Sequence, residues 1–366
     1  MKTSKLLPAL LVVVSLLIAN TPARACTSFV LRDKDSYVYG RTMEFGKSLD
    51  EQLVLYPRGY EFKGTGPDGV VGSGINWKAK NAVVGINAFQ LDLLVDGMNE
   101  KGMSGGILNL PNSAEYQNPT GDDAKNSIAS YQILLWALTN FDNTDEVRAA
   151  LPKIFVNGAS LKQWNGTVKI HMTLHDMQGK SIVVEYVDGG KLTIYDNPIG
   201  TMANDPPFDW HLANVGNYVN LSPVEVLPKT IDGVTFHPPS SGSGLHGLPG
   251  DFLSPSRFLR ALEFSQAAQK YAADQPRVKL AWHIINMFDI PPGSVMIPAG
   301  DPYAGGEAGW EYTQESIVTD PKNLTYYFRP FATLNIQKFD MKSADLDAKD
   351  KKVWEMSTTT TYVEVK

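Results

Sequence analysis

The sequence predicts an α+β fold, because segments with strand character and segments with helix character occur in separate runs. Strand-like segments follow one another in pairs joined by short polar turns, as at 27–31 and 37–41. Helical periodicity appears in three stretches, without a strict alternation of strand and helix. Such runs favour α+β layering over a parallel doubly wound sheet. Hydrophobic residues make up 43% of the 366 residues, which is enough for a large buried core.

Eight segments are predicted as strands from their β-branched and alternating residues. The segments 168–174 and 181–187, joined by Gln178-Gly179-Lys180, are expected to form a hairpin, as are the last two segments. A tight connection is expected at 97–102, and one closing strand in the tail beyond Met341. The predicted strands are 27–31, 37–41, 81–89, 102–110, 168–174, 181–187, 316–319 and 325–329.

Three stretches repeat apolar residues at helical spacing, and their apolar faces are predicted to pack into the core. The stretch 127–140 places its apolar side chains on one face. The stretch 255–272 is predicted to be a helix capped by Ser254, and a third helix, 277–288, is expected to end before two prolines.

The first 25 residues have the pattern of a secretory signal peptide. Lys2 and Lys5 precede an apolar run at 6–19, and Ala23-Arg24-Ala25 supplies a small-x-small cleavage site. The run is shorter than the about 20 apolar residues that a membrane-spanning helix needs, so an uncleaved anchor is the less favoured alternative. We therefore expect a signal peptide at 1–25, one domain at 26–366, and a periplasmic or secreted protein.

Cleavage after Ala25 makes Cys26 the first residue of the mature chain. A bacterial lipoprotein also begins with cysteine, but Arg24 fits poorly among the small residues expected there, so lipidation is the minor alternative. Cys26 is the sole cysteine and cannot form an intramolecular disulfide. Because an unpaired thiol in an oxidising compartment is open to damage, we predict that it has a chemical role.

A terminal cysteine carries both a nucleophile and a base. Its α-amino group titrates near pH ~8 and can take the proton of the thiol and later give it to a leaving amine. A neighbouring cation favours the reactive thiolate. If 27–31 and 37–41 pair as a hairpin, Arg41 returns close to Cys26; an ordinary surface arginine at a strand end is the alternative.

Several short motifs occur in order along the chain from Cys26 to about Tyr327. They are CTSF at 26–29, GRTMEF at 40–45, GMNEKGM at 97–103, LNLP at 108–111, NDP at 204–206, FDWH at 208–211, GLPGDF at 247–252 and SRF at 256–258. Together they resemble the choloylglycine hydrolase / penicillin V acylase family of N-terminal-nucleophile cysteine hydrolases, and the export signal resembles the Gram-negative branch of that family. The resemblance implies a four-layer αββα sandwich with two antiparallel sheets between helical layers.

Carried over residue by residue, the resemblance implies a catalytic group. Its nucleophile would attack an amide carbonyl, its two arginines would surround the thiolate, and its two asparagines would stabilise the oxyanion and orient the amine. Glu44 stands where the family has an aspartate that binds the terminal amine, and it is one methylene longer, so this contact must shift. The implied group is Cys26, Arg41, Glu44, Asn109, Asn204 and Arg257.

The implied reaction is hydrolysis of a linear carboxamide through an acyl-thioester on Cys26. The family cleaves conjugated bile acids or penicillin V, and some exported members cleave acyl-homoserine lactones. Asn109 is similar to the bile-salt-cleaving members, so a bile-acid amide is the first expected substrate and the other two are alternatives. Phe45, Phe89 and Tyr116 are predicted to line an apolar acyl pocket.

The remaining expectations concern partners. The net charge of −6 is mild and no block of like charges stands out, so we expect a small-molecule substrate, no nucleic acid, and no membrane contact beyond export. No cofactor or metal is implied, and His171 and His175, four apart in a predicted strand, are expected to be ordinary strand histidines. A homotetramer is implied by the resemblance. An inactive exported binding protein of the same fold is the non-enzymatic alternative.

Overall fold

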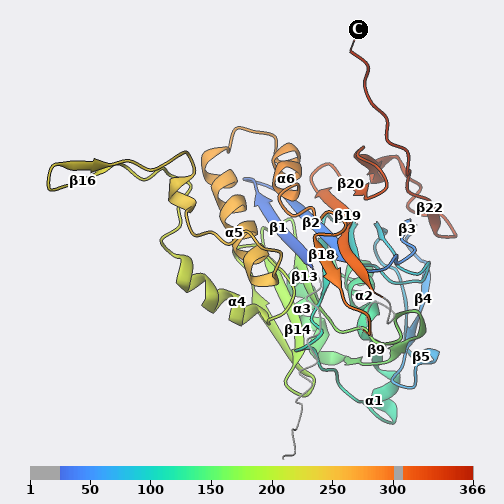
Figure 1. Ribbon diagram of the computed structural model, residues 1–366. Helices are drawn as coiled ribbons and strands as arrows, with labels where there is room; N and C mark the ends of the chain where they lie inside the picture. Colours follow the sequence, from blue (N-terminus) through green and yellow to red (C-terminus); the bar gives the residue numbers. More distant parts are fainter. Residues whose placement is uncertain (1–24, 301–307, 366) are drawn as a thin grey trace, which may run out of the picture.

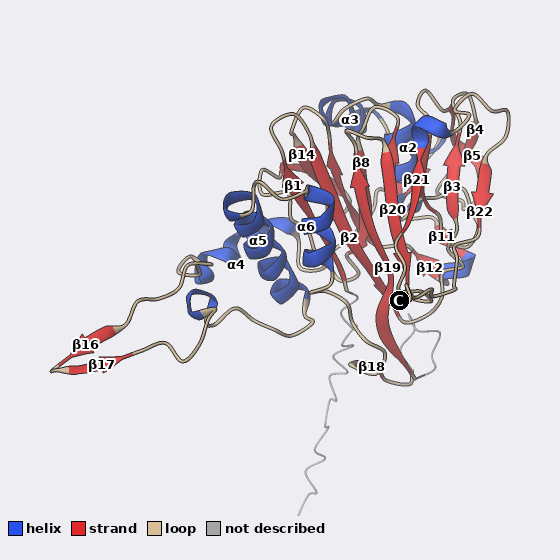
Figure 2. Ribbon diagram, turned by 90° about the horizontal axis from the view of Figure 1, so that it is seen from above, coloured by secondary structure: helices blue, strands red, loops and turns tan. Residues whose placement is uncertain are grey.

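The computed structural model describes residues 25–300 and 308–365, so residues 1–24 of the signal peptide predicted at 1–25 lie outside the described residues. Two large antiparallel sheets pack face to face, and helices cover their outer faces (Figure 1). Helices α5 (Ser254–Tyr271) and α6 (Arg277–Ile285) lie on one sheet, and α2 (Ile133–Asn140) lies on the other. The layers therefore follow the expected αββα order, which Figure 2 shows from above.

The six-stranded sheet carries the start of the mature chain. The hairpin predicted from 27–31 and 37–41 is confirmed, and its register places Cys26 opposite Met43 and Ser28 opposite Arg41. In order, the strands are β1 (Cys26–Arg32), β2 (Tyr37–Phe45), β19 (Gly309–Asp320), β20 (Thr325–Pro330) and β21 (Gln337–Asp340), with β18 (Val295–Ile297) also paired to β19.

The eight-stranded sheet contains the strands predicted at 81–89, 102–110, 168–174 and 181–187. The hairpin expected from 168–174 and 181–187 is confirmed, and so is a closing strand in the tail. In order, the strands are β15 (Lys191–Asp196), β14 (Ser181–Val187), β13 (Ile170–His175), β8 (Ser104–Asn109), β7 (Asp96–Asn99), β6 (Val83–Ile86), β3 (Leu53–Tyr56) and β22 (Lys352–Trp354).

Shorter elements complete the described chain. Two-stranded ribbons are formed by β4 (Glu61–Thr65) with β5 (Val71–Lys78), β9 (Ser127–Ala129) with β10 (Phe155–Asn157), β11 (Ser160–Leu161) with β12 (Gly166–Thr167), and β16 (Lys229–Ile231) with β17 (Val234–Phe236). The other α-helices are α1 (Asp122–Lys125), α3 (Thr144–Ala150) and α4 (Phe208–Val215).

Two helix predictions were wrong at their N-terminal ends. The stretch predicted as a helix at 127–140 begins as β9, which pairs in parallel with β10, and becomes α-helical only at Ile133. Pairing with β10 satisfies the backbone N–H and C=O groups of residues 127–129, which were predicted to lie in the first turn of the helix. The other error concerns α5, where Leu253 is the N-cap and Ser254 already lies inside the helix, without a capping side-chain bond.

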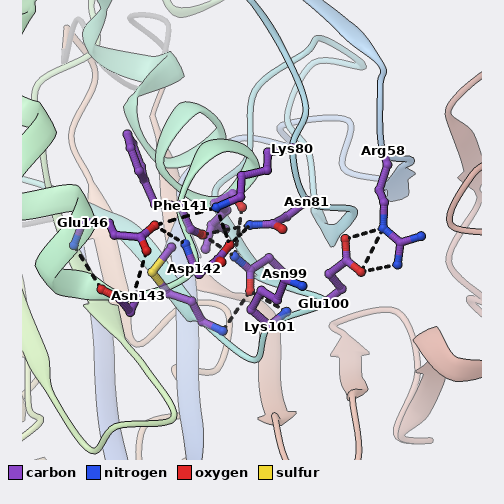
Figure 3. A network of polar contacts seen from close by, with 12 residues as sticks. Arg58, Lys80, Asn81, Asn99, Glu100, Lys101, Phe141, Asp142, Asn143 and Glu146 are labelled. Carbon is purple, nitrogen blue, oxygen red and sulfur yellow. Dashed lines mark hydrogen bonds and ion pairs between the residues drawn. The ribbon is translucent and has the colours of Figure 1, made fainter.

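The tight connection expected at 97–102 is shorter than predicted, because residues 97–99 belong to β7, a strand that the sequence analysis missed, and only residues 100–103 turn into β8. The Asn99 side chain fixes this turn, because Oδ1 accepts hydrogen bonds from the backbone N–H groups of Lys101 (3.1 Å) and Met103 (2.9 Å). Its Nδ2 donates to the Phe141 carbonyl at 2.9 Å, while Glu100 pairs with Arg58 (Figure 3). The turn thereby sets the positions of β7 and β8, which carry site residues.

The core lies mainly between the two sheets. Strands β1 and β2 are buried on both faces, because one face meets the opposite sheet and the other meets α5 and α6. Phe29 packs under these helices with Phe288, whereas Cys26 and Met43 belong to the inter-sheet core. No helix within residues 25–300 and 308–365 is long and apolar enough to span a membrane.

Candidate active site

Cys26 begins β1 and is buried, with only 3% of its surface exposed. Its backbone N–H donates a hydrogen bond to Asn204 Oδ1. The segment that carries Asn204 is held beside β1 by paired backbone bonds between Ser28 and Met202, at 2.8 and 3.0 Å. Strand β1 therefore brings Cys26 into contact with Asn204, although the two residues are far apart in the sequence.

Arg41 approaches the thiol from the neighbouring strand β2. Its Nη2 lies 3.8 Å from Cys26 Sγ and donates to the Ile107 carbonyl at 2.7 Å. Its Nη1 donates to the Val95 carbonyl and lies 3.4 Å from Asp96 Oδ2. This guanidinium is fully buried beside the sulfur. The sequence-based placement of Arg41 near Cys26 therefore agrees with the structure.

Asp96 is a site residue that the sequence analysis missed. It is fully buried in β7, contacts Arg41, and accepts a hydrogen bond from the Tyr326 hydroxyl. Burial raises the pKa of Asp96 to about 6, although the guanidinium of Arg41 acts in the opposite direction. The available signal was an acidic residue directly before the motif at 97–103.

Arg257 reaches the nucleophile from α5, on the helical side of the sheet. Its Nη1 donates to the Cys26 carbonyl and, at 2.7 Å, to Thr27 Oγ1, while Nη2 donates to Asn204 Oδ1 at 3.1 Å. The Nε group donates to the Phe252 carbonyl at 2.9 Å, within the loop that leads into the helix. The recorded hydrogen bonds of Arg257 thus hold the backbone of Cys26 and the amide of Asn204.

Glu44 borders the same pocket from β2. Its Oε1 accepts a hydrogen bond from Thr313 Oγ1 at 3.0 Å, and its Oε2 is buried without a hydrogen-bond partner in the described part of the chain. Burial raises the pKa of the Glu44 carboxyl to about 8, while the charge of Arg257 opposes this shift and that of Glu311 adds to it. The carboxyl is therefore expected to be largely protonated at neutral pH when no further cation is present.

Asn109 and Asn204 are linked to each other and to the protein interior. Asn204 Nδ2 donates to the Asn109 carbonyl at 2.9 Å, and Asn109 is one of the residues that line the pocket. The Asn204 carbonyl lies 2.8 Å from His211 Nε2, whose ring stacks on Phe258. Burial lowers the pKa of His211 to about 4, so the ring is neutral at pH 7 and its Nε2–H donates to that carbonyl.

A narrow pocket of about 40 Å³ lies beside Cys26 and is lined mainly by apolar side chains. Phe45 and Phe89 line it, as does Trp164, whose ring centroid lies 4.9 Å from that of Phe45. The sequence analysis missed Trp164, because it lies outside the predicted strands and helices. The described lining residues are Cys26, Arg41, Met43, Glu44, Phe45, Leu49, Ala88, Phe89, Leu93, Val95, Ile107, Asn109, Tyr131, Leu161, Trp164, Val168 and Ile170.

Tyr116 does not belong to this pocket, which corrects the sequence-based assignment. It borders a different surface hollow. Its hydroxyl is fixed by the Val168 and Ile170 carbonyls, both at 3.1 Å, and accepts a hydrogen bond from the Ile170 N–H at 2.8 Å. The phenol thus satisfies backbone groups of a neighbouring segment instead of facing a ligand.

The histidines of β13 have structural partners, in agreement with the sequence analysis. His171 Nδ1 lies 2.9 Å from Glu185 Oε1, and His175 Nδ1 lies 2.7 Å from Ser181 Oγ. Within residues 25–300 and 308–365, no group of three or more His, Cys, Asp or Glu side chains is arranged to hold a metal ion.

Comparisons with known proteins agree with this geometry. A family model described as linear amide C-N hydrolases, choloylglycine hydrolase family, matches residues 26–354. The chain is 30% identical over 337 residues to a bile salt hydrolase/transferase of Clostridium perfringens, covering 91% of this chain and 98% of that protein. It is 25% identical over 340 residues to a penicillin V acylase of Pectobacterium atrosepticum, covering 90% of this chain and 84% of that protein.

A solved structure of a mutant conjugated bile acid hydrolase from Clostridium perfringens superposes with a TM-score of 0.82 at 29% identity. The match covers 93% of this chain and 100% of that one. The predicted N-terminal-nucleophile fold is thereby confirmed. The chain belongs to the choloylglycine hydrolase family of linear amide C-N hydrolases.

Proposed function

We propose that Cys26, freed as the N-terminal residue by removal of residues 1–25, is the nucleophile of an exported amide hydrolase. The observation that carries this proposal is the grouping around one residue: Arg41 lies beside its sulfur, and Asn204 accepts a hydrogen bond from its nitrogen. Sulfur and nitrogen of a single residue then serve as nucleophile and base.

The first half-reaction forms a thioester. The Cys26 sulfur bonds to the amide carbonyl carbon, and the thiol proton passes to the α-amino nitrogen. That proton then moves to the leaving nitrogen as the C–N bond breaks. Asn109, which lines the pocket, is the proposed oxyanion donor, and Asn204 orients the amine; a fixed donor of this kind is worth on the order of 3 kcal/mol.

The second half-reaction returns the enzyme. Water bonds to the thioester carbonyl carbon and gives one proton to the α-amino nitrogen. The C–S bond then breaks, the sulfur regains a proton, and a carboxylic acid leaves. Arg41 stabilises the sulfur anion that attacks in the first half and leaves in the second, because its Nη2 lies 3.8 Å from the sulfur on the paired strand β2.

The first proposed substrate class is conjugated bile-acid amides. The pocket beside Cys26 is lined mainly by apolar side chains, which suits a hydrophobic acyl group. Asn109, which lines it, resembles the residue of the bile-salt-cleaving members of the family, and bile salt hydrolases are among the relatives of the chain.

Penicillin V is the second candidate, and the ring cluster of the pocket favours it. Trp164 lies against Phe45 and meets Phe89 edge-on, with ring centroids 6.4 Å apart. Such a cluster suits an aromatic acyl group. A long acyl-homoserine lactone is the third alternative, since the apolar lining also accommodates a linear chain.

The test compares turnover of glycocholate, penicillin V and a long-chain acyl-homoserine lactone by the processed protein and by Cys26→Ser. We expect glycocholate to have the highest kcat/KM and the variant to lose activity. A faster rate with penicillin V or the lactone would reassign the substrate. Unchanged turnover by Cys26→Ser would overturn the mechanism. The alternative of an inactive binding protein predicts instead that Cys26 is dispensable for the role of the protein.

We also propose export to the periplasm or beyond, as in the Gram-negative branch. Intact-mass analysis of the secreted protein is expected to give a chain that starts at Cys26 and takes up one iodoacetamide group. A mass that includes lipid would support the lipoprotein alternative, and a mass that includes residues 1–25 would contradict processing.

A homotetramer is the proposed assembly. The ribbon of β16 and β17 extends away from the body of the molecule (Figures 1 and 2). Ile231 and Phe236 in the ribbon and Leu227 just before it are exposed. Exposed apolar groups on a projecting element favour contact with a second copy of the chain. Light scattering is expected to give a tetramer that Leu227→Ser with Phe236→Ser dissociates; a monomeric parent chain would contradict this.

A further inference from the structure

Glu311 is a second buried carboxylate next to Glu44. It lies on β19, and only 2% of its surface is exposed. Thr313, two residues further along the strand, donates to Glu44 Oε1 at 3.0 Å. Because side chains two apart on a strand share a face, Glu311 is directed to the same side of the sheet as this contact. The two carboxylates are close enough that Glu311 contributes to the raised pKa of Glu44.

The position of Glu311 is informative because of the atom that it binds. Its Oε1 accepts a hydrogen bond from the backbone N–H of Ala25, the residue directly before the nucleophile. Ala25 itself is 2% exposed. Since Cys26 pairs with Met43 in the β1–β2 register, the next pair along would place residue 25 opposite Glu44. Glu44 and Glu311 therefore both lie around the point where the mature chain begins.

Removal of residues 1–25 changes the groups at this point. The nitrogen of Ala25 is three covalent bonds from the nitrogen of Cys26, so the two atoms are about 3–4 Å apart. Processing removes the Ala25 N–H donor and turns the Cys26 nitrogen into a primary amine that bears up to three protons. The Glu311 carboxylate, which loses its Ala25 partner and lies next to the position of that nitrogen, is well placed to accept one of these protons, since a buried charge needs a partner.

We propose that Glu311 binds the terminal ammonium of mature Cys26, together with Asn204 and Glu44, and so acts as a positioning residue for the catalytic amine. This inference rests on the proposed role of Cys26 as the N-terminal nucleophile. It also accounts for the longer side chain at position 44, because a second carboxylate from β19 shares the contact with the amine.

The charge of Glu311 shifts the pKa of the Cys26 amine in one direction. A carboxylate stabilises the ammonium form and raises the pKa of the amine, whereas nearby arginines lower it. Because only the neutral amine accepts a proton, Glu311 moves the acidic limb of the pH–rate profile to higher pH. The titratable and charged groups that face the amine are Glu44 and Arg41 of β2, Glu311 of β19, Arg257 of α5 and the Cys26 thiol.

The test measures the amine directly. Because Cys26 is the sole cysteine, labelling with carbon-13 and nitrogen-15 cysteine gives one spin system, whose pH titration by NMR reports the amine without requiring activity. In Glu311→Gln we expect the pKa of the amine to fall by roughly 0.5–1 unit. The acidic limb of kcat/KM should move by the same amount, and Glu311→Asp should restore part of the shift.

Glu315→Gln is the matched control, because Glu315 is also buried in β19 but the charged groups that raise its pKa are Glu51 and Asp96. It should leave the amine titration unchanged. An amine titration that is the same in Glu311→Gln and the parent chain, with both folded by circular dichroism, would overturn this inference alone. An amine that shifts as expected in a chain whose turnover does not need Cys26 would uphold it while refuting the proposed function.

Discussion

Arg41 Nη2 lies 3.8 Å from Cys26 Sγ, and the same guanidinium is held by three acceptors on the opposite sheet. The charge beside the sulfur is thus supplied by β2, while its direction is fixed by Val95, Asp96 and Ile107. The active site therefore depends on the packing of the two sheets against each other as well as on the β1–β2 hairpin.

Arg41→Lys is expected to lower the rate of amide hydrolysis by about 10²-fold. Lysine retains the charge but cannot reach all three acceptors and the sulfur with one ammonium, so the buried acceptors lose partners at about 1–3 kcal/mol each. The pH profile of Cys26 alkylation by iodoacetamide measures the effect on the thiol. Arg58→Lys, in a partly exposed ion pair with Glu100, is the control and should leave this profile unchanged. Equal alkylation profiles for Arg41→Lys and the parent would contradict the assigned role.

Much of the site follows from local sequence patterns. The alternation in 27–31 and 37–41 predicts a hairpin, and a hairpin alone brings Arg41 back to Cys26. The resemblance to a known family extended this to Asn204 and Arg257, whose hydrogen bonds to Cys26 cross about half of the chain or more.

The remaining site residues depend on contacts that no local pattern encodes. Asp96 becomes a partner of Arg41 only because the two sheets face each other, and Glu311 reaches the start of β1 from a strand near the other end of the chain. Tyr116 was misplaced for a related reason, since an aromatic residue in sequence does not reveal which hollow it borders. Helix and strand also compete at 127–129, where pairing with β10 decides the outcome.

Glu44 is expected to make stability depend on pH in a chain that retains Ala25 before Cys26. Burial raises the folded-state pKa of this carboxyl to about 8, from an ordinary value of 4.5. The folded state therefore favours the protonated form: its stabilising contribution is fully present below about pH 4.5 and is lost as pH rises through about 8. Between pH 4 and pH 9, the Tm measured by thermal unfolding should decline less steeply with rising pH in Glu44→Gln than in the parent.

The processed chain supplies the comparison for this experiment. Its terminal ammonium adds an opposite charge beside Glu44, which lowers the pKa of the carboxyl. The difference in Tm between the processed parent and processed Glu44→Gln should accordingly depend less on pH than the same difference in the Ala25-containing form. Parallel pH dependences for the parent and Glu44→Gln in the Ala25-containing form would rule out a buried, protonated Glu44.

Asn204→Ala is expected to reduce kcat by about 10²- to 10³-fold, with a smaller effect on KM. The change removes the acceptor of the Cys26 nitrogen and of Arg257 Nη2, so the amine loses its orientation in the transition state. Steady-state kinetics at a fixed pH measures this split. Asn217→Ala, at an exposed asparagine after α4, should behave as the parent. A kcat within threefold of the parent for Asn204→Ala would show that the amine needs no such partner.

Trp164→Ala is expected to raise KM about tenfold while changing kcat little, because the indole contacts the acyl group in the ground state and the transition state alike. Its packing against Phe45 makes it part of the pocket wall, and the shortened side chain removes apolar contact area there. Tyr116→Phe is the matched control. Tyr116 lies outside the pocket, and its hydroxyl bonds only backbone groups of Val168 and Ile170, so its removal should cost about 1 kcal/mol of stability and leave KM unchanged. A KM that rises in Tyr116→Phe but not in Trp164→Ala would contradict this prediction. It would place the acyl group in the hollow that Tyr116 borders and would make Tyr116 a substrate-binding residue.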